Sequence, residues 1–383
     1  MNWPLINEKM INSVSNILKS GKLNQWNNTI VNEFEKKFAE YINSKYAIAV
    51  FNGTVALELC VKALNLKEND EVIVTPRTFI ASASCYAWYG IKPIFVDVDI
   101  NSQNITLENI KEAITSKTKA VILVHLSGWP CDLEEICNYC KGKGIYIIED
   151  CAQAHGAKYK NKSVGTWGDI NAWSFCQDKI ITTGGEGGMV TTNCPELYKK
   201  AWSLKDHGKE YDLCFNKEHQ SGIKWLHTNI GTNWRMMPIQ AVIGIDALDE
   251  LDKWVNHRRK IAHIYNEGLK NLEGVRLTIP DENIVYHSYY KYYFFIDAAK
   301  FKISRNEILE LINKEGIFAQ IGSCGEIYKE KALFSFSPEK ELHVTKNLFD
   351  TSILLLCDPT ITEQKAFDSV KKIREIITCA IKL

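Results

Sequence analysis

One lysine lies in a setting that suggests covalent chemistry. Lys179 belongs to the stretch Trp173-Ser-Phe-Cys-Gln-Asp-Lys-Ile-Ile-Thr-Thr-Gly-Gly-Glu-Gly-Gly, between a strand-like apolar run and a glycine-rich turn. A lysine amine attacks a carbonyl only after it has lost its proton, and a tight turn beneath a cofactor favours that loss. The alternative is an ordinary surface lysine in a loop, but the flanking Ser-Phe and Gly-Glu-Gly-Gly are unlike a random loop.

A carboxylate ends another hydrophobic run. Asp150 lies in Ile147-Ile-Glu-Asp-Cys-Ala-Gln-Ala-His-Gly, where the apolar residues predict a buried strand. A carboxylate buried there needs a cationic partner, and a protonated pyridine nitrogen would supply one. The alternative interpretation is an aspartate that caps a following helix.

Two further segments lie where helices are expected to begin. Asn52-Gly-Thr-Val-Ala-Leu precedes an apolar helical pattern, and such a start is a natural phosphate site. Gly231-Thr-Asn-Trp-Arg-Met-Met-Pro-Ile-Gln-Ala places Asn233 and Arg235 before a long helix, where they would easily contact a neighbouring subunit. Ordinary helix capping is the alternative for both segments.

The elements that must position these residues alternate between strands and helices. The spacing predicts crossover connections and a mainly parallel sheet with helices on both faces, a three-layer α/β domain. In such sheets the ligand site lies at the carboxyl edge of the strands. The expected helices of this half are Ile30 to Ile42 and Val55 to Leu64, and the expected strands are Glu71 to Thr75, Pro93 to Val98, Ala120 to His125, Ile145 to Asp150 and Asn171 to Phe175.

The pattern changes in the last third of the chain. We expect a large domain over residues 1–240, followed over 241–383 by a long connecting helix and a smaller α+β domain. The expected elements are a helix over Ile239 to Leu269, a strand-like run over Tyr286 to Ile296, and helices over Ser304 to Glu315, His343 to Leu355 and Thr362 to Ile381.

Composition excludes several classes of function. The 383 residues carry 46 Lys plus Arg and 46 Asp plus Glu, so no net charge attracts nucleic acid or an anionic membrane. No apolar run is long enough to cross a bilayer, and Met1 to Met10 lacks the pattern of a signal peptide. The 12 cysteines include one Cys-x-x-Cys, Cys137 to Cys140, in a predicted helix without a second pair. We therefore expect reduced thiols, no metal site and a cytoplasmic protein.

The four segments, in this order, resemble the DegT/DnrJ/StrS family of sugar aminotransferases, which have the fold of type I pyridoxal-phosphate (PLP) enzymes. The resemblance runs from about Leu23 to the last helix and is strongest from Asn52 to Gln240. Its most specific parts are the Ser-Phe, Lys and Gly-Glu-Gly-Gly pattern ending at Gly188, and Asn-x-Arg-Met ahead of Gln-Ala. Some members carry histidine in place of the lysine and are dehydratases or deoxygenases, so Lys179 favours transamination.

The resemblance implies a role for each matched residue. Lys179 would carry PLP as a Schiff base and act as the catalytic base, and Asp150 would pair with the pyridine nitrogen. Gln153 would lie near the ring hydroxyl, and Phe79, in Pro76-Arg-Thr-Phe-Ile-Ala-Ser, would stack on the ring. The phosphate would be held by Gly53, Thr54 and Ser174, and by Asn233 of the partner subunit in a homodimer with shared sites.

Two segments depart from the family pattern and leave the ketone open. His125-Leu-Ser-Gly-Trp-Pro stands where members often have His-Leu-Tyr-Gly, and Gln320-Ile-Gly-Ser-Cys-Gly-Glu-Ile-Tyr replaces a His-Tyr-x-Pro-Leu-His stretch. Both regions normally face the substrate. The leading hypothesis is a nucleotide-linked 4-keto-6-deoxy or 3-keto hexose with L-glutamate as donor. Alternatives are a smaller phosphorylated ketone or a cyclitol ketone, and a PLP-binding regulator without turnover.

Overall fold

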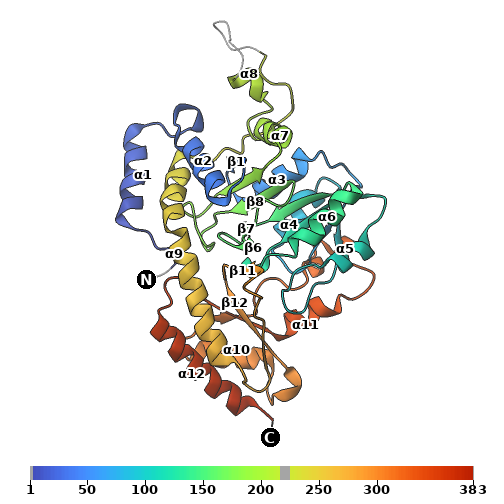
Figure 1. Ribbon diagram of the computed structural model, residues 1–383, viewed down its shortest axis with the longest axis vertical. Helices are drawn as coiled ribbons and strands as arrows, with labels where there is room; N and C mark the ends of the chain where they lie inside the picture. Colours follow the sequence, from blue (N-terminus) through green and yellow to red (C-terminus); the bar gives the residue numbers. More distant parts are fainter. Residues whose placement is uncertain (1–2, 216–224, 383) are drawn as a thin grey trace.

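A seven-stranded and a four-stranded sheet, connected by one long helix, form the framework of the protein (Figure 1). The computed structural model describes residues 3–215 and 225–382. Met1 and Asn2, the first residues of the segment Met1 to Met10 that lacks the pattern of a signal peptide, lie outside the described residues.

The larger sheet is mainly parallel, as expected. Its strand order is β1-β9-β8-β5-β4-β2-β3, and only the pairings of β9 with β1 and β8 are antiparallel. The sequence patterns predicted five of these strands and missed the two that form the antiparallel edge, β1 and β9. The bounds are β1 Tyr46–Val50, β2 Glu71–Val74, β3 Lys92–Phe95, β4 Thr118–Val124, β5 Tyr146–Asp150, β8 Ile170–Ser174 and β9 Gly188–Thr192.

Alternate strand residues point into two separate cores, one on each face of this sheet. Ile147 on β5 belongs to the core that includes residues of helices α2, α5, α6 and α9, whereas the next residue, Ile148, belongs to the core that includes residues of α3, α4 and α7. This period of two confirms the three-layer architecture. The helices are α2 Ile30–Ile42, α3 Gly53–Ala63, α4 Ala81–Ala87, α5 Leu107–Ala113, α6 Leu133–Lys143, α7 Pro195–Lys205 and α9 Pro238–Leu269.

The second sheet is antiparallel and has its own core. Its strand order is β10-β12-β14-β13, and it packs against the C-terminal half of α9 with α10 and α12. A small third sheet joins β11 Val285–Tyr286 to β6 Lys158–Tyr159 and β7 Lys162–Ser163. The remaining elements are α1 Glu8–Ser20, α8 Tyr211–Phe215, β10 Val275–Leu277, β12 Tyr292–Ile296, α10 Arg305–Lys314, β13 Ala319–Gln320, α11 His343–Thr351, β14 Ser352–Leu355 and α12 Glu363–Ala380.

Two expectations for this part are wrong in detail. The helix expected over His343 to Leu355 ends at Thr351, and the last four residues form β14, which is paired on both sides by β12 and β13. The strand expected over Tyr286 to Ile296 is split in two, because β11 pairs with β6 whereas β12 pairs with β10 and β14, and Tyr289 between them adopts a left-handed backbone with φ of 46°. In both places tertiary contacts override the local pattern.

Helix α9 connects the two cores, as expected. Its buried residues from Ala241 to Val255 belong to the core of the larger sheet, and those from Ile261 to Leu269 belong to the core of the second sheet. We propose residues 240/241, near the start of this helix, as the boundary between a large and a small domain.

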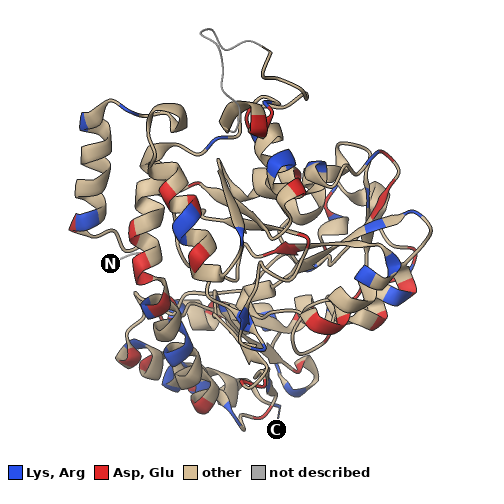
Figure 2. Ribbon diagram, turned by 45° about the horizontal axis from the view of Figure 1, so that its top comes forward, with Lys and Arg blue, Asp and Glu red and all other residues tan. Residues whose placement is uncertain are grey.

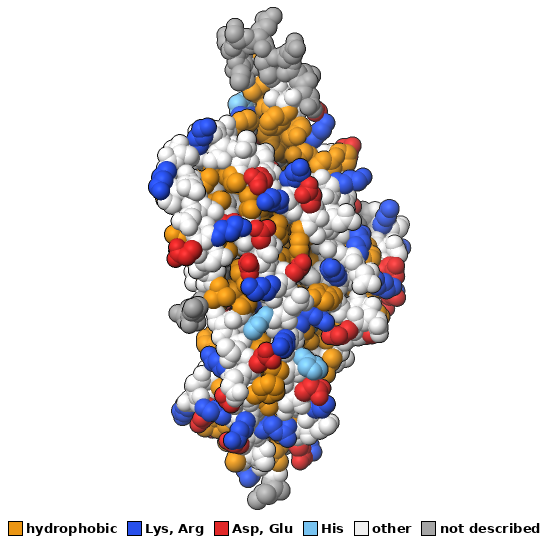
Figure 3. All heavy atoms as spheres, turned by 60° about the vertical axis from the view of Figure 1, so that its left-hand side comes forward, with side chains coloured by type: hydrophobic (Ala, Val, Ile, Leu, Met, Phe, Trp, Pro, Cys, Tyr) orange, Lys and Arg blue, Asp and Glu red, His pale blue; other side chains and the backbone are white. Residues whose placement is uncertain are grey.

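The surface carries no single dominant sign of charge. Figure 2 shows basic and acidic residues interspersed over the helices. Hydrophobic side chains gather toward the end of the molecule that carries α7 and α8 (Figure 3). Within the described residues, no helix combines the length and apolar composition needed to cross a membrane.

Candidate active site

A cavity of about 440 Å³ lies at the carboxyl edge of the larger sheet. Strands β5 and β8 end there, and helix α3 begins there. The structure brings most of the predicted site residues together in its lining, namely Gly53, Thr54, Phe79, Asp150, Gln153, Ser174 and Lys179.

The start of α3 forms a close-fitting wall of the cavity. Asn52 caps the helix, because its Oδ1 accepts a 2.9 Å hydrogen bond from the backbone N–H of Val55, so the capping interpretation is confirmed for this residue. A Cβ on Gly53 would lie only 2.5 Å from the Cβ of Ser174. Glycine therefore allows the helix start to approach the end of β8, and this is a narrow cradle of the kind that suits a phosphate.

Asp150 is a buried carboxylate without an ionic partner within 4.0 Å among the described residues. Its oxygens accept hydrogen bonds from the Ser82 hydroxyl at 2.7 Å and from the Ala152 N–H at 3.1 Å. Burial raises the pKa of Asp150, and these bonds and the charge of Lys179 only partly oppose it. No helix begins directly after Asp150, so the alternative interpretation as a helix cap is wrong. A cationic ring nitrogen fits this position because it would supply the missing charge.

Lys179 projects from a tight turn, and its side chain is 16% exposed. Its backbone N–H donates to the carbonyl of Cys176 at 3.1 Å, and its own carbonyl accepts a 3.0 Å hydrogen bond from the indole N–H of Trp3. The N-terminal segment therefore anchors the turn. The nearest carboxylate oxygen is Oδ1 of Asp178, at 3.9 Å from Nζ.

Gln153 and Phe79 both line the cavity. The Oε1 atom of Gln153 accepts a 2.8 Å hydrogen bond from the backbone N–H of Ser127, which fixes the side-chain amide. Phe79 remains 60% exposed, so its ring has a free face for another planar group. The donor set, the cradle at Gly53 and the buried Asp150 together fit PLP.

Asn233 does not line the cavity of its own chain. It is exposed and lies before α9, opposite Asp206 in an isolated bridge. Arg235 is held within the chain by a 2.8 Å ion pair with Asp206. Gln240 caps α9, because its Oε1 accepts from the Met237 N–H, while its Nε2 donates at 2.8 Å to the carbonyl of Glu186. The expected role of Asn233 therefore depends on a second subunit.

The two segments that depart from the family pattern lie beside the cavity. Ser127 contacts Gln153 and also donates a 2.7 Å hydrogen bond to the carbonyl of Lys291. In the second segment, the Ile327 N–H donates at 3.1 Å to the carbonyl of Pro76, just ahead of Phe79. The first segment therefore contacts a residue that lines the cavity, and the second contacts the turn that leads to the lining residues Thr78 and Phe79.

A buried histidine–carboxylate pair explains the one group of possible metal ligands in the described part of the chain, His125, Glu149 and Cys151. His125 Nε2 donates to Glu149 at 2.9 Å, and its Nδ1 accepts from the Cys131 N–H at 3.1 Å. Both ring nitrogens are engaged, so the pair is a structural link. Cys137 and Cys140 lie in α6 as expected, and all twelve cysteines carry free thiols.

Sequence reasoning missed two polar residues of the site. Ser82 lies one helical turn after Phe79, and this spacing is the signal that could have placed it beside the cavity. Asp178 adjoins Lys179, but its partner, Tyr290, lies 112 positions away. No local pattern reveals such a contact.

Several proteins that are similar to this chain are aminotransferases. GDP-perosamine synthase of Escherichia coli O157:H7 is 43% identical over 260 residues, which cover 68% of each protein. The dTDP-3-amino-3,6-dideoxy-alpha-D-galactopyranose transaminase of Aneurinibacillus thermoaerophilus is 40% identical over 243 residues, or 63% of each. The X-ray structure of the aminotransferase from Psychrobacter cryohalolentis matches with a TM-score of 0.97 and 42% identity over 99% of both chains. The model of the DegT/DnrJ/EryC1/StrS aminotransferase family matches residues 4–374, and the chain is therefore an aminotransferase of this family.

Proposed function

We propose that this aminotransferase uses PLP to convert a keto group of a nucleotide-linked sugar into an amino group. The observation that carries the proposal is the meeting of Lys179, Asp150 and the cradle at Gly53 in one cavity. Relatives whose names specify GDP- and dTDP-linked amino sugars support a nucleotide-linked substrate. These relatives differ in their nucleotide, so the proposal leaves the nucleotide open. For the sugar we propose a 4-keto-6-deoxy or 3-keto hexose.

When bound, PLP supplies an electron sink for the charge that develops as a carbon next to nitrogen loses its proton. Asp150 would hold its negative charge against the ring nitrogen. Lys179 would hold the cofactor covalently, and its Nζ, once released, would accept and return the proton of the reacting carbon. Phe79 would pack on the ring, and Gln153 would orient it at the ring hydroxyl.

The phosphate would be held by Gly53, Thr54 and Ser174, and by Asn233 of the partner subunit. Exposed hydrophobic side chains near that region support a homodimer, since large apolar patches mark interfaces. They include Trp26, Phe215, Trp225 and Ile230, of which the last two are 89% and 95% exposed. Twelve free thiols support a reducing compartment, and we propose the cytoplasm.

A second candidate is a smaller phosphorylated ketone or a cyclitol ketone. The observation that favours it is the unusual segment around Gln320, which is bonded through Ile327 to the turn carrying Phe79. A change of pocket shape there would alter selectivity without affecting the cofactor residues.

The test begins with the colour of the purified protein. PLP held by Lys179 absorbs visible light, and L-glutamate should bleach that absorbance by converting the cofactor to its amino form. A panel of nucleotide-linked keto sugars, phosphorylated ketones and cyclitol ketones is then added to the amino form. Return of the absorbance with a keto sugar supports the proposal. Return only with the smaller ketones rejects the nucleotide-sugar assignment, and binding without bleaching by any amino donor identifies a regulator.

A further inference from the structure

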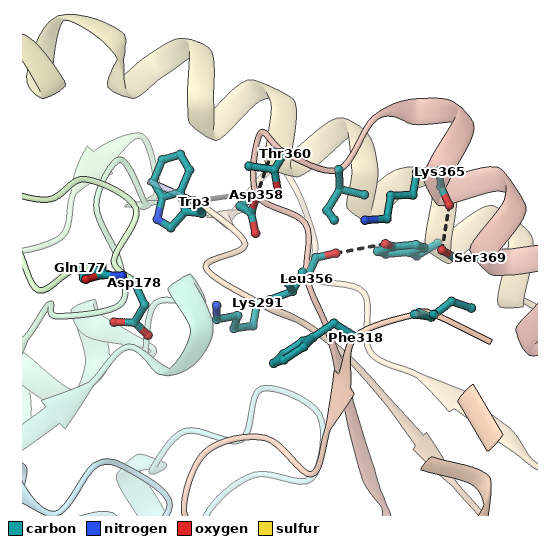
Figure 4. A pocket seen from close by; sticks show the side chains of 14 residues that line it. Trp3, Gln177, Asp178, Lys291, Phe318, Leu356, Asp358, Thr360, Lys365 and Ser369 are labelled. Atoms are coloured by element: carbon teal, nitrogen blue, oxygen red, sulfur yellow. Dashed lines mark hydrogen bonds between the residues drawn. The ribbon is translucent and has the colours of Figure 1, made fainter. Parts of the chain in front are cut away.

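Asp178 is a carboxylate shared between two cavities. It precedes Lys179 and lines both the cavity described above and an adjoining one of about 350 Å³ that reaches the second sheet. In Figure 4, Asp178 and Lys291 lie on facing walls of this adjoining cavity. The Asp178 side chain is 56% exposed, so a ligand can reach it.

The two oxygens of Asp178 have different partners. Oδ1 lies 3.9 Å from Nζ of Lys179, and no other carboxylate of the described residues lies within 4.0 Å of that nitrogen. Oδ2 accepts a short hydrogen bond from the hydroxyl of Tyr290, which lies between β11 and β12. Tyr290 therefore holds one oxygen of Asp178, and the other oxygen, Oδ1, faces Nζ of Lys179.

Tyr290 is itself held between two cations. Its ring centroid lies 4.9 Å from Nζ of Lys179 and 4.7 Å from Nζ of Lys291, and the residue is only 6% exposed. Burial and the charge of Asp178 raise the pKa of Tyr290 well above its usual value, so the hydroxyl keeps its proton. Tyr290 thus acts as a permanent donor in a fixed place.

Asp178 remains ionised in this environment. Burial, the largest single influence, would raise the pKa of Asp178, but the charge of Lys179 and the hydrogen bond from Tyr290 outweigh it and lower the pKa. The result is an oriented negative charge beside the amine of Lys179. A positively charged group that approaches Lys179 is repelled by the lysine and attracted by this carboxylate.

We propose that Asp178, oriented by Tyr290, is the docking point for the ammonium group of the amino donor. The inference rests on the proposed transamination and adds a residue that recognises the donor. The amino donor must bring its ammonium group close to Nζ of Lys179, and Oδ1 of Asp178, 3.9 Å from that atom, offers the ammonium an opposite charge. A keto acid of the same carbon skeleton has no ammonium group and gains nothing from this carboxylate, so Asp178 favours the amine over the ketone.

The first test compares the reaction of L-glutamate with the PLP-loaded protein and the reaction of 2-oxoglutarate with the amino form of the cofactor. Asp178→Asn removes the charge, Tyr290→Phe removes only the hydroxyl, and Asp252→Asn is a matched control in which a remote aspartate accepts a 2.6 Å hydrogen bond from Tyr41. The saturation of the absorbance change is followed with each ligand. We expect Asp178→Asn to weaken L-glutamate binding about tenfold and Tyr290→Phe about threefold. Binding of 2-oxoglutarate should be unchanged, as should both ligands in the control.

Equal losses for both ligands, or no loss for either, would overturn the proposal. A second measurement needs neither turnover nor donor. In the cofactor-free protein, reductive methylation of Lys179 at a fixed pH is mapped by mass spectrometry, with the exposed Lys36 as internal reference. Asp178→Asn removes the carboxylate that lies 3.9 Å from Nζ of Lys179, so this amine should be methylated several-fold faster in the variant because it is no longer engaged in an ion pair.

The two measurements separate this inference from the proposed function. The charge of Lys179 also acts on two other titratable groups, Asp150 and His155. Neither of these residues is substituted in the variants. If the wild-type protein fails to react with L-glutamate, the glutamate assignment fails while the methylation rate still decides the role of Asp178. An unchanged methylation rate in Asp178→Asn overturns that role even in an active aminotransferase.

Discussion

Glu149 and Asp150 are consecutive buried carboxylates whose pKa values are shifted in opposite directions. Strand alternation directs them to opposite faces of the larger sheet. Burial is the largest influence on both carboxylates, and by itself it would raise the pKa of each. Glu149 accepts hydrogen bonds from His125 and from three backbone N–H groups, which outweigh burial and lower its pKa. Asp150 has too few such bonds, so its pKa stays raised.

Replacement of Asp150 should cost activity and improve the stability of the cofactor-free protein. Asp150→Asn removes the charge that would keep a ring nitrogen protonated, so kcat should fall by orders of magnitude. The raised folded-state pKa means that the ionised carboxylate destabilises the fold once pH exceeds its unfolded pKa. The Tm of cofactor-free Asp150→Asn should therefore exceed that of wild type at neutral pH, and the difference should vanish in acid. An unchanged kcat would show that Asp150 does not serve the cofactor.

Replacement of Glu149 should have the opposite effect on stability. Glu149→Gln replaces one acceptor oxygen by an NH2 group and leaves buried donors around it without a partner, a change that costs about 1–3 kcal/mol for each such donor. Because the folded-state pKa of Glu149 is lowered, its contribution is present above the unfolded pKa and is lost as pH falls through the folded pKa. Denaturant unfolding at several pH values should show a large deficit at neutral pH that shrinks in acid. A deficit independent of pH would contradict this account.

Loss of the reactive amine should stop turnover without unfolding the protein. Lys179→Ala should lose the visible absorbance of covalently held PLP and retain the wild-type far-ultraviolet circular dichroism. The anchoring bond from Trp3 is made to a backbone carbonyl and survives the substitution. Near-native kcat in this variant, without added amines, would mean that another residue performs the chemistry.

A methyl group at Gly53 should disrupt the phosphate cradle. In Gly53→Ala the new Cβ would lie 2.5 Å from that of Ser174, so either α3 or β8 must shift. Such overpacking costs about 1–3 kcal/mol, and PLP affinity should fall with it. Gly142→Ala in α6 is the matched control, because its Cβ meets nothing within 4 Å. That substitution should stabilise the protein by about 1 kcal/mol and leave PLP affinity unchanged. Equal PLP affinity in both variants would argue against the cradle.

The proposed sharing of sites between subunits can be tested by complementation. Asn233→Asp should impair PLP retention, because it places a carboxylate against the phosphate with little change in shape. Arg235 is left intact since it pairs with Asp206 inside its own chain. Mixed with Lys179→Ala protein, the variant should form heterodimers with one intact site, and part of the activity should return. Chain exchange demonstrated by mass spectrometry without returned activity would mean that each chain builds its own site.

The sequence by itself determined the larger sheet's parallel strands, the long connecting helix and the residues that meet in the cavity. Their signals are local: an apolar run ends at Asp150, and glycines follow Lys179 within a few residues. The alternatives that the sequence left open were decided by the structure, since Asn52 does cap α3 whereas no helix follows Asp150.

Only the tertiary structure decided which remote residues complete the site. Ser82 reaches Asp150 across 68 positions, and Tyr290 reaches Asp178 across 112. Residues Ser352–Leu355 continue a helical pattern, but they form a strand because β12 and β13 pair with both of its edges. Such contacts arise from the packing of the whole chain, and their hydrogen bonds outweigh local propensity, which therefore cannot reveal them.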